Sequence, residues 1–182
     1  QRLDKMKNLW NQSDAAACNS ELDLRVYSSR LLGAAPSLVL HGGGNTSVKA
    51  EFTNVFSESV PALYVKGSGW DLRTIEAAGF PPVDLAYLLR LGALAELSDT
   101  DMMLQLRLAL LDPAGPTPSV EAILHAIIPC KYVDHTHADA VVTLSNTPDG
   151  TGLLQDLFGD EVLILPYTCL LYTSPSPRDL DL

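Results

Sequence analysis

The chain has 182 residues, of which 47% are hydrophobic, and a formal net charge of −10, which suits one ordinary globular domain and excludes a disordered or fibrous chain. The acidic balance argues against nonspecific binding to nucleic acid or anionic membranes, because both need clustered lysine and arginine. No apolar run approaches the roughly 20 residues of a membrane span, and the start lacks the apolar core of a signal peptide, so a cytoplasmic protein is expected.

The N-terminal half of the chain alternates helical and strand patterns. Residues 21–35 carry apolar side chains at helical spacing and end near Gly33, which predicts an amphipathic helix. Two short strands are expected around the glycine cluster of 37–50, and a third in 62–71 runs into a second glycine turn. The segment between them, EFTNVFSESV, is typical of a hairpin or a variable insertion.

The C-terminal half is predicted to be mainly helical, with two further strands. Ser98 and Asp101 are placed to cap one of its helices. Helices are expected at 72–78, 83–97, 99–111, 119–128, 139–144 and 152–158, and strands at 131–142 and 161–166. Because helices and strands alternate without an internal repeat, the sequence predicts an α/β fold with helices around one sheet.

The tail does not continue this pattern. Residues 169–179, CLLYTSPSPRD, resemble a translated adapter from a transposase-based sequencing library. We therefore expect 1–168 to be the native domain, lacking its C-terminal part, and 169–182 to be a non-native extension that packs poorly.

Two histidines stand one residue apart in KYVDHTHADAVV. Because strand side chains alternate between faces, His135 and His137 are expected on one face, roughly 6.5 to 7 Å apart at Cβ. Two imidazoles so placed can close on one metal ion. A hydrogen-bonded pair with no metal is the commoner explanation of so short a pattern.

Two glycine turns offer backbone amides to an anion. HGGGNTS adds the side chains of Asn45 and Ser47, and KGSGWD places Ser68 and Gly69 at a strand end. A plain hairpin turn explains the first cluster almost as well, but two such turns favour an anionic ligand. Ser119, at the start of its expected helix, adds a hydroxyl.

Glu121 has two interpretations. An acid in a first helical turn most often complements the helix dipole. Beside His135 and His137, however, its carboxylate could move a proton while a metal stabilises an oxyanion. His125, four residues on and on the same helical face, would either orient Glu121 or simply pack.

The motifs GGGNTS, VKGSGWDL, PSVEAILH and YVDHTHADAV, in that order, resemble the class II aldolase/adducin family. The chain is similar to the N-terminal aldolase half of bifunctional aldolase/short-chain dehydrogenases linked to rhamnose breakdown. The resemblance covers essentially residues 9–168. It implies a three-layer α/β/α sandwich around one mainly antiparallel sheet, incomplete at the C-terminus.

The resemblance also implies residue roles. Glu121 falls on the catalytic acid/base, with a possible second role as a metal ligand, and His135 and His137 fall on the first two zinc ligands. No histidine follows His137, so a third ligand is expected beyond the chain. A second phosphate-binding serine is replaced by Val120. The implied phosphate-binding residues are Gly44, Asn45, Ser68, Gly69 and Ser119.

The activity implied is zinc-dependent cleavage of a ketose 1-phosphate, rhamnulose 1-phosphate above all, to dihydroxyacetone phosphate and lactaldehyde. NAD would serve only a dehydrogenase half absent from this chain. The resemblance also implies a homotetramer of the whole protein, and we expect the chain alone to be inactive. Two alternatives stay open, a sugar-phosphate 4-epimerase of the same family and a non-catalytic adducin-like binding module.

Overall fold

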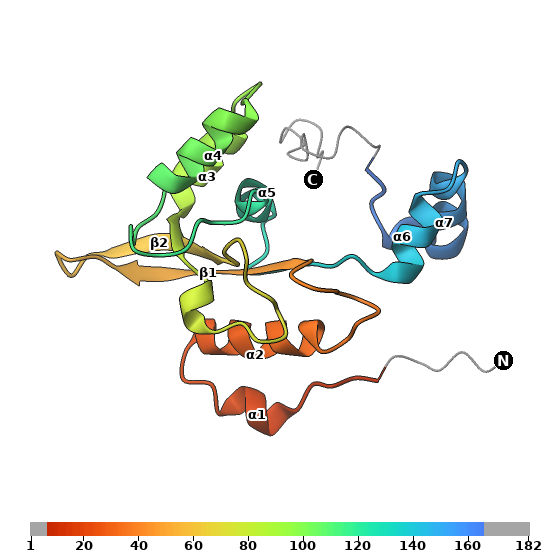
Figure 1. The fold of residues 1–182 in the computed structure, drawn as a ribbon, viewed down its shortest axis with the longest axis horizontal. Helices are drawn as coiled ribbons and strands as arrows, with labels where there is room; N and C mark the ends of the chain where they lie inside the picture. Colours follow the sequence, from red (N-terminus) through yellow and green to blue (C-terminus); the bar gives the residue numbers. More distant parts are fainter. Residues whose placement is uncertain (1–6, 166–182) are drawn as a thin grey trace.

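A computed structural model describes residues 7–165, which form one antiparallel sheet with helices on both faces (Figure 1). Each neighbouring pair of strands is antiparallel, and the order across the sheet is β3-β2-β1-β4. A tight hairpin joins the two long central strands, as expected from EFTNVFSESV. The strands are β1 (Asn45–Thr53), β2 (Ser59–Val65), β3 (Pro82–Asp84) and β4 (Tyr132–His135).

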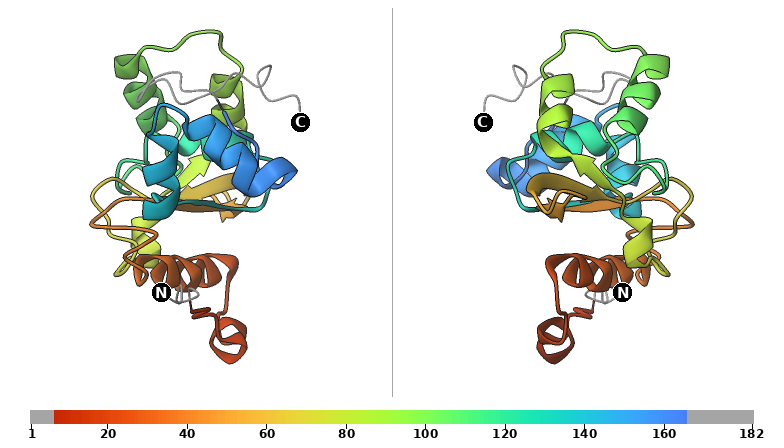
Figure 2. Two further views of the ribbon diagram at one scale, coloured as in Figure 1. Left: turned by 90° about the vertical axis from the view of Figure 1, so that its right-hand side faces the viewer. Right: turned by 90° about the vertical axis from the view of Figure 1, so that its left-hand side faces the viewer.

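The helices make the outer layers. One face of the sheet is covered by α2, with α1 below it, and the other by α3, α4 and α5, while α6 and α7 lie beyond one end (Figures 1 and 2). The arrangement is the three-layer sandwich that the sequence analysis anticipated. The helices are α1 (Gln12–Ala16), α2 (Glu21–Gly33), α3 (Leu85–Gly92), α4 (Asp99–Leu108), α5 (Ala122–Ile127), α6 (Asp139–Ser145) and α7 (Gly150–Phe158), with single 3₁₀ turns η1 (Ala77–Gly79) and η2 (Gly159–Glu161).

Each face of the sheet has its own apolar core. The larger one joins strand residues such as Leu63 and Val83 to Leu88 of α3, Leu106 of α4 and Ile123 of α5. A smaller core on the opposite face is formed mainly by residues from the loops around β1 and β2, namely Val39, Leu72, Ile75 and Phe80. Burying apolar side chains on both faces is what makes the sheet a central layer.

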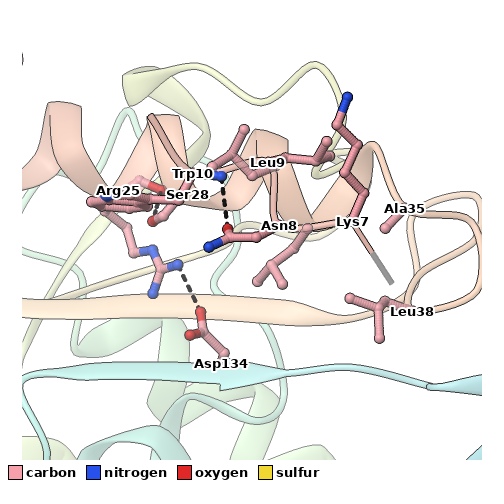
Figure 3. Close-up of a pocket in the computed structure, with 11 residues that line it drawn as sticks. Lys7, Asn8, Leu9, Trp10, Arg25, Ser28, Ala35, Leu38 and Asp134 are labelled. Atoms are coloured by element: carbon pink, nitrogen blue, oxygen red, sulfur yellow. Dashed lines mark hydrogen bonds and ion pairs between the residues drawn. The ribbon is translucent and has the colours of Figure 1, made fainter. Parts of the chain in front are cut away.

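Helix α2 contacts the sheet through two buried polar side chains, Arg25 and Ser29, in addition to its apolar packing. The buried Arg25 pairs with Asp134 of β4 at 2.6 Å (Figure 3). It also donates to the backbone oxygen of Ser47. Its neighbour one turn on, Ser29, shares a hydrogen bond with Thr46 at 2.8 Å. Beside the ion pair, a cavity of about 330 Å³ lies between α2 and residues 7–10. Arg25 thus ties α2 to the strand that carries the first histidine.

Several expected helices have different bounds. Residues 72–78 form no α-helix, because the Asp71 carboxylate accepts a hydrogen bond from the amide of Arg73 and a turn results. The expected helix at 83–97 begins as β3, and Asp84 then caps α3 by accepting from the amide of Tyr87. Helix α5 starts only at Ala122, because the backbone amide of Ser119 donates a hydrogen bond to the backbone oxygen of Lys66 and the chain there is not yet helical.

Three expected strands differ from the structure. Residues 37–40, expected as a strand before the glycine cluster, form a turn in which the amides of Leu38 and Val39 donate to the oxygen of Ala35. The strand at 131–142 was predicted too long, and residues 161–165 form no strand. The strand at 131–142 ends at His135, because the amide of His137 turns to the oxygen of Leu38 and α6 begins at Asp139. Residues 162–165 of the expected last strand lie beside no strand of the described chain, and an unpaired strand is not stable. The helices expected at 21–35, 99–111, 139–144 and 152–158 are confirmed, with shifts of a few residues at their ends.

None of the helices described is long and apolar enough to cross a membrane. The segment 169–182, for which the sequence predicts a non-native origin and poor packing, lies outside the described residues.

Candidate active site

A cavity of about 310 Å³ lies where three loops meet the end of β4. Residues 42–44 precede β1, residues 66–69 follow β2, and residues 119–121 precede α5. The register of the sheet brings them together, because the start of β1 pairs with the end of β2 on one side and the end of β4 on the other. His135 and His137 complete the wall.

Glu121 lies in this wall with each carboxylate oxygen engaged. Oε1 is 2.9 Å from Nδ1 of His135, and Oε2 accepts a hydrogen bond of 2.9 Å from Nδ2 of Asn45. Burial acts to raise the pKa of Glu121, but His135, Asn45 and the nearby His125 outweigh it and lower the pKa to about 2. The carboxylate is therefore ionised at neutral pH.

The two histidines lie side by side, as the spacing predicted, although only His135 belongs to the strand. Their ring centroids are 4.7 Å apart with 58° between the planes. Because Nδ1 of His135 faces the Glu121 carboxylate, Nε2 is the nitrogen free to bind a ligand, which is the usual carboxylate–histidine arrangement at zinc sites. His135 also approaches Glu121 as predicted.

This donor set fits part of a zinc site. Two adjacent imidazoles are typical zinc ligands, and a catalytic site usually has three protein ligands. Within residues 7–165, no group of three histidine, cysteine, aspartate or glutamate side chains is arranged to hold a metal ion. His135 and His137 can therefore account for two ligands.

The residues expected to hold phosphate surround the same cavity, with one exception. Gly44, Ser68, Gly69 and Ser119 all line it, as does Val120, which replaces the family's second serine. Gly44 has a φ of +67°, and a Cβ atom there would lie 2.9 Å from the oxygen of His135. The exception is Asn45, whose side chain is buried and directed at Glu121 instead.

Lys66 lines the cavity and was missed by the sequence analysis. Its Nζ donates to the oxygen of Gly42 at 2.9 Å, and burial lowers its pKa against the opposing charges of Glu121 and Asp71. The sequence did contain a signal for Lys66. In YVKGSG, the lysine stands at the end of an apolar strand and directly before a glycine turn. Lys66 is a cationic group beside the amides of both turns.

His125 lies behind Glu121, 1% exposed, with Nδ1 2.8 Å from the hydroxyl of Ser47. Burial lowers the pKa of His125 to about 4, despite the opposing charge of Glu121. The imidazole is therefore neutral at pH 7 and fixed by β1. The sequence left two roles open for His125, orienting Glu121 or packing. The hydrogen bond to Ser47 and the burial of the ring show the packing role directly.

Comparison with known proteins agrees with this geometry. The family model described as the Class II Aldolase and Adducin N-terminal domain matches residues 25–174, ending within the segment 169–182. The uncharacterized oxidoreductase YuxG of Bacillus subtilis (strain 168) is 33% identical over 162 residues, which are 89% of this chain and 24% of that protein. The chain thus spans about a quarter of this curated relative.

A solved structure shows the same fold. It is the N-terminal class II aldolase domain of a conserved protein from Thermoplasma acidophilum, with a TM-score of 0.82 and 37% identity. The match covers 90% of this chain and 74% of that one. With the family match over most of its length and with Glu121, His135 and the glycine turns around one cavity, the chain belongs to the class II aldolase and adducin family.

Proposed function

We propose that this chain is the aldolase domain of an enzyme that cleaves a ketose 1-phosphate, with rhamnulose 1-phosphate as the substrate and dihydroxyacetone phosphate and lactaldehyde as the products. The observation that carries the proposal is the ionised Glu121 in contact with His135, inside a cavity ringed by two glycine turns. An acid/base group and an anion site then share one cavity of about 310 Å³.

The phosphate of the substrate would bind at the glycine turns. Ser68 and Ser119 offer hydroxyl donors, and Gly44 and Gly69 offer backbone without side-chain bulk. Lys66 supplies a positive charge that a dianion needs in an otherwise acidic protein. Anchoring the phosphate fixes the distance to the carbon–carbon bond that breaks, so remote binding energy aligns the reacting atoms.

Glu121 would carry the proton. In the cleavage direction, its carboxylate takes the proton of the hydroxyl next to the breaking bond, and that carbon becomes the aldehyde. The electron pair of the bond passes towards the ketone oxygen as an enediolate forms. Glu121 then returns the proton to the carbon of this enediolate, which becomes dihydroxyacetone phosphate.

His135 and His137 would hold a divalent metal, most simply zinc, with Glu121 as a further possible ligand. When bound, the metal supplies Lewis-acid stabilisation of the oxygen on which negative charge develops. The role of Glu121 towards His135 is to hold the imidazole with Nδ1 protonated, which leaves Nε2 as the coordinating nitrogen.

The whole protein is proposed to be bifunctional. The Bacillus subtilis relative is about four times as long as the matched region and is described as an oxidoreductase, which supports a second half that oxidises the aldehyde with NAD. The homotetramer and the cytoplasmic location stay predictions.

The test is release of dihydroxyacetone phosphate from rhamnulose 1-phosphate by the product of the parent gene, with zinc present. We expect turnover that falls roughly 100-fold or more in Glu121→Gln, while Glu76→Gln, an exposed matched control, leaves it unchanged. Interconversion of epimeric sugar phosphates without release would assign the epimerase instead. Phosphate binding with no turnover of any ketose 1-phosphate would assign a binding module.

A further inference from the structure

Strand β4 carries His135 as its last residue and is held by the sheet on one side. It has four residues and lies at the edge, paired only with β1 among the strands of residues 7–165. The end of a short edge strand has few backbone contacts, so it opens more readily than the centre of a sheet. A side chain placed there for binding needs a further attachment to stay in position.

The buried guanidinium of Arg25, on α2, supplies that attachment on one face of the sheet. Nη2 lies 2.6 Å from Oδ1 of Asp134, and the guanidinium carbon lies 5.7 Å from the ring centroid of Tyr132. Figure 3 shows the ion pair reaching from the helix to the strand. Because strand side chains alternate between faces, His135 points to the opposite face, where it contacts Glu121.

Each nitrogen of this guanidinium is engaged, which fixes its position. Nε donates to the hydroxyl of Ser29 at 3.2 Å, and Nη1 donates to the backbone oxygen of Ser47 in β1 at 3.3 Å. Arg25 therefore joins α2, β1 and β4 directly beside the histidine. A buried arginine loses its water, and an apolar side chain of similar volume is often at least as stabilising. The place of Arg25 beside His135 points to a role in the site.

A second ion pair joins α2 to the other end of β4. Glu21, at the start of α2, pairs with Lys131, directly before β4, and both side chains are about half exposed. Such an exposed pair is screened by water and contributes little. Because it lies at the end of the strand away from His135, it is a matched control for the buried pair.

We propose that Arg25, acting through Asp134, is a positioning residue for His135. The ion pair on the α2 face fixes the end of β4, so that the imidazole on the other face keeps its contact with Glu121 and leaves Nε2 free for a metal ion. The metal in this inference rests on the proposed function. The attachment of β4 by Arg25 does not.

The attachment is tested by native-state amide hydrogen exchange in the full chain. Asp134→Ala removes the partner of Arg25. We expect the amides of Val133 and His135 to exchange about 10-fold faster or more, the scale of a lost charged hydrogen bond, because the pair breaks whenever the end of β4 opens. Glu21→Gln should change these rates by less than about twofold.

Exchange in β2 follows the loss of overall stability and is measured in the same experiment. Faster exchange in β2 with unchanged exchange in β4 would overturn the inference, because the ion pair would then survive the opening of the strand. An equal acceleration of β4 by Glu21→Gln would also overturn it. Asp134→Asn, which retains the volume of the side chain, takes the place of Asp134→Ala if that variant does not fold.

The role towards the metal is tested in the product of the parent gene. We expect Asp134→Ala to weaken zinc binding about 10-fold, the lower end of the range for groups that support a ligand, and Glu21→Gln to leave it unchanged. Cobalt in place of zinc gives an absorption spectrum that reports the ligand geometry, and this spectrum should change only in Asp134→Ala. Asp134→Asn keeps an oxygen acceptor for Arg25 and should recover most of the affinity.

A purely structural ion pair would lower stability but leave the metal affinity and the cobalt spectrum of the folded protein unchanged, which would overturn the positioning role. Failure of the proposed function gives a different result, a wild-type protein that binds no zinc. The exchange experiment needs no metal, so it then still decides whether Arg25 holds the strand that carries His135.

Discussion

At the scale of single residues, the buried imidazole of His125 makes the fold sensitive to acid. Its pKa is about 4 in the folded protein and 6.5 in an exposed histidine, so the unfolded chain takes up a proton first as the pH falls. Above pH 6.5 the neutral His125 contributes fully to the free energy of unfolding. Between pH 6.5 and 4 the free energy of unfolding falls by about 3 kcal/mol, because the unfolded chain binds the proton and the folded one does not. Urea unfolding across this range measures the loss.

The control for this prediction is His125→Asn, which retains a polar group to face Ser47 but does not titrate. The unfolding free energy of the variant should depend less on pH than that of the wild type between pH 4 and 6.5. Parallel curves would show that other groups, and not His125, carry the dependence.

Gly44 and Gly69 make a matched pair of substitutions. Both have positive φ, at +67° and +85°, so alanine at either costs roughly 1–2 kcal/mol in backbone strain. A Cβ at Gly44 would also contact the oxygen of His135 at 2.9 Å, whereas a Cβ at Gly69 meets nothing within 4 Å. We expect Gly44→Ala to lower the unfolding free energy clearly more. Equal losses in chemical denaturation would mean that the close approach to β4 does not matter.

At this scale the sequence predicted most of the residues that line the candidate cavity, and the misses have a physical cause. Glu121, His135 and His137 were found because their chemistry and spacing are local. Lys66 was missed because a lysine at a strand end is normally solvated, and only the packing of the loop at Gly42 buries it. The direction of the Asn45 side chain depends on contacts 76 residues away, which no local pattern contains.

At the scale of elements, the start of α4 is held by a reciprocal cap. The hydroxyl of Ser98 accepts from the amide of Asp101 at 3.1 Å and donates to its carboxylate at 2.6 Å. Ser98→Ala should cost about 1 kcal/mol of unfolding free energy. Thr100→Ala, exposed in the same turn, should change it by less than about 0.5 kcal/mol. A similar loss in both variants, measured by thermal or urea unfolding, would argue against the cap.

Elements with their own caps and periodicity were predicted well, and those that depend on a distant partner were not. Helices α2 and α4 carry serine caps that can be read from the sequence. Strand β3 has only three residues and exists because Val83 lies between β2 and a bridge to Leu110. The apolar run 162–165 shows the converse, a strand pattern with no partner in the described chain.

At the scale of the whole molecule, apolar side chains are concentrated on α6, α7 and the segment after them. Leu157 is 63% exposed and Leu163 66%, and six further large apolar residues there are at least 37% exposed. Such a surface favours association between copies. We expect the chain to self-associate in sedimentation or light scattering as its concentration rises, and Leu157→Ser with Leu163→Ser to weaken this.

The hairpin between β1 and β2 provides the control. Val55 and Phe56 are also exposed, at 90% and 76%, but they stand apart from the α6–α7 surface. Replacing both with serine should leave self-association largely unchanged. Equal effects from the two pairs would point to nonspecific aggregation.

The pairing of Asn45 with His135 also determines when the site can exist during synthesis of the chain. A ribosome that has released residues 1–130 has supplied both glycine turns, Lys66 and Glu121, but not β4. Until that last strand docks beside β1, the acid lacks its contact with His135 and keeps only those with Asn45 and Ser119. Because such long-range pairing forms slowly compared with local helices, we expect the acid to become oriented only when β4 pairs with β1. Under the proposed function, nascent chains and early folding intermediates would therefore present the phosphate-binding turns before they could orient the acid.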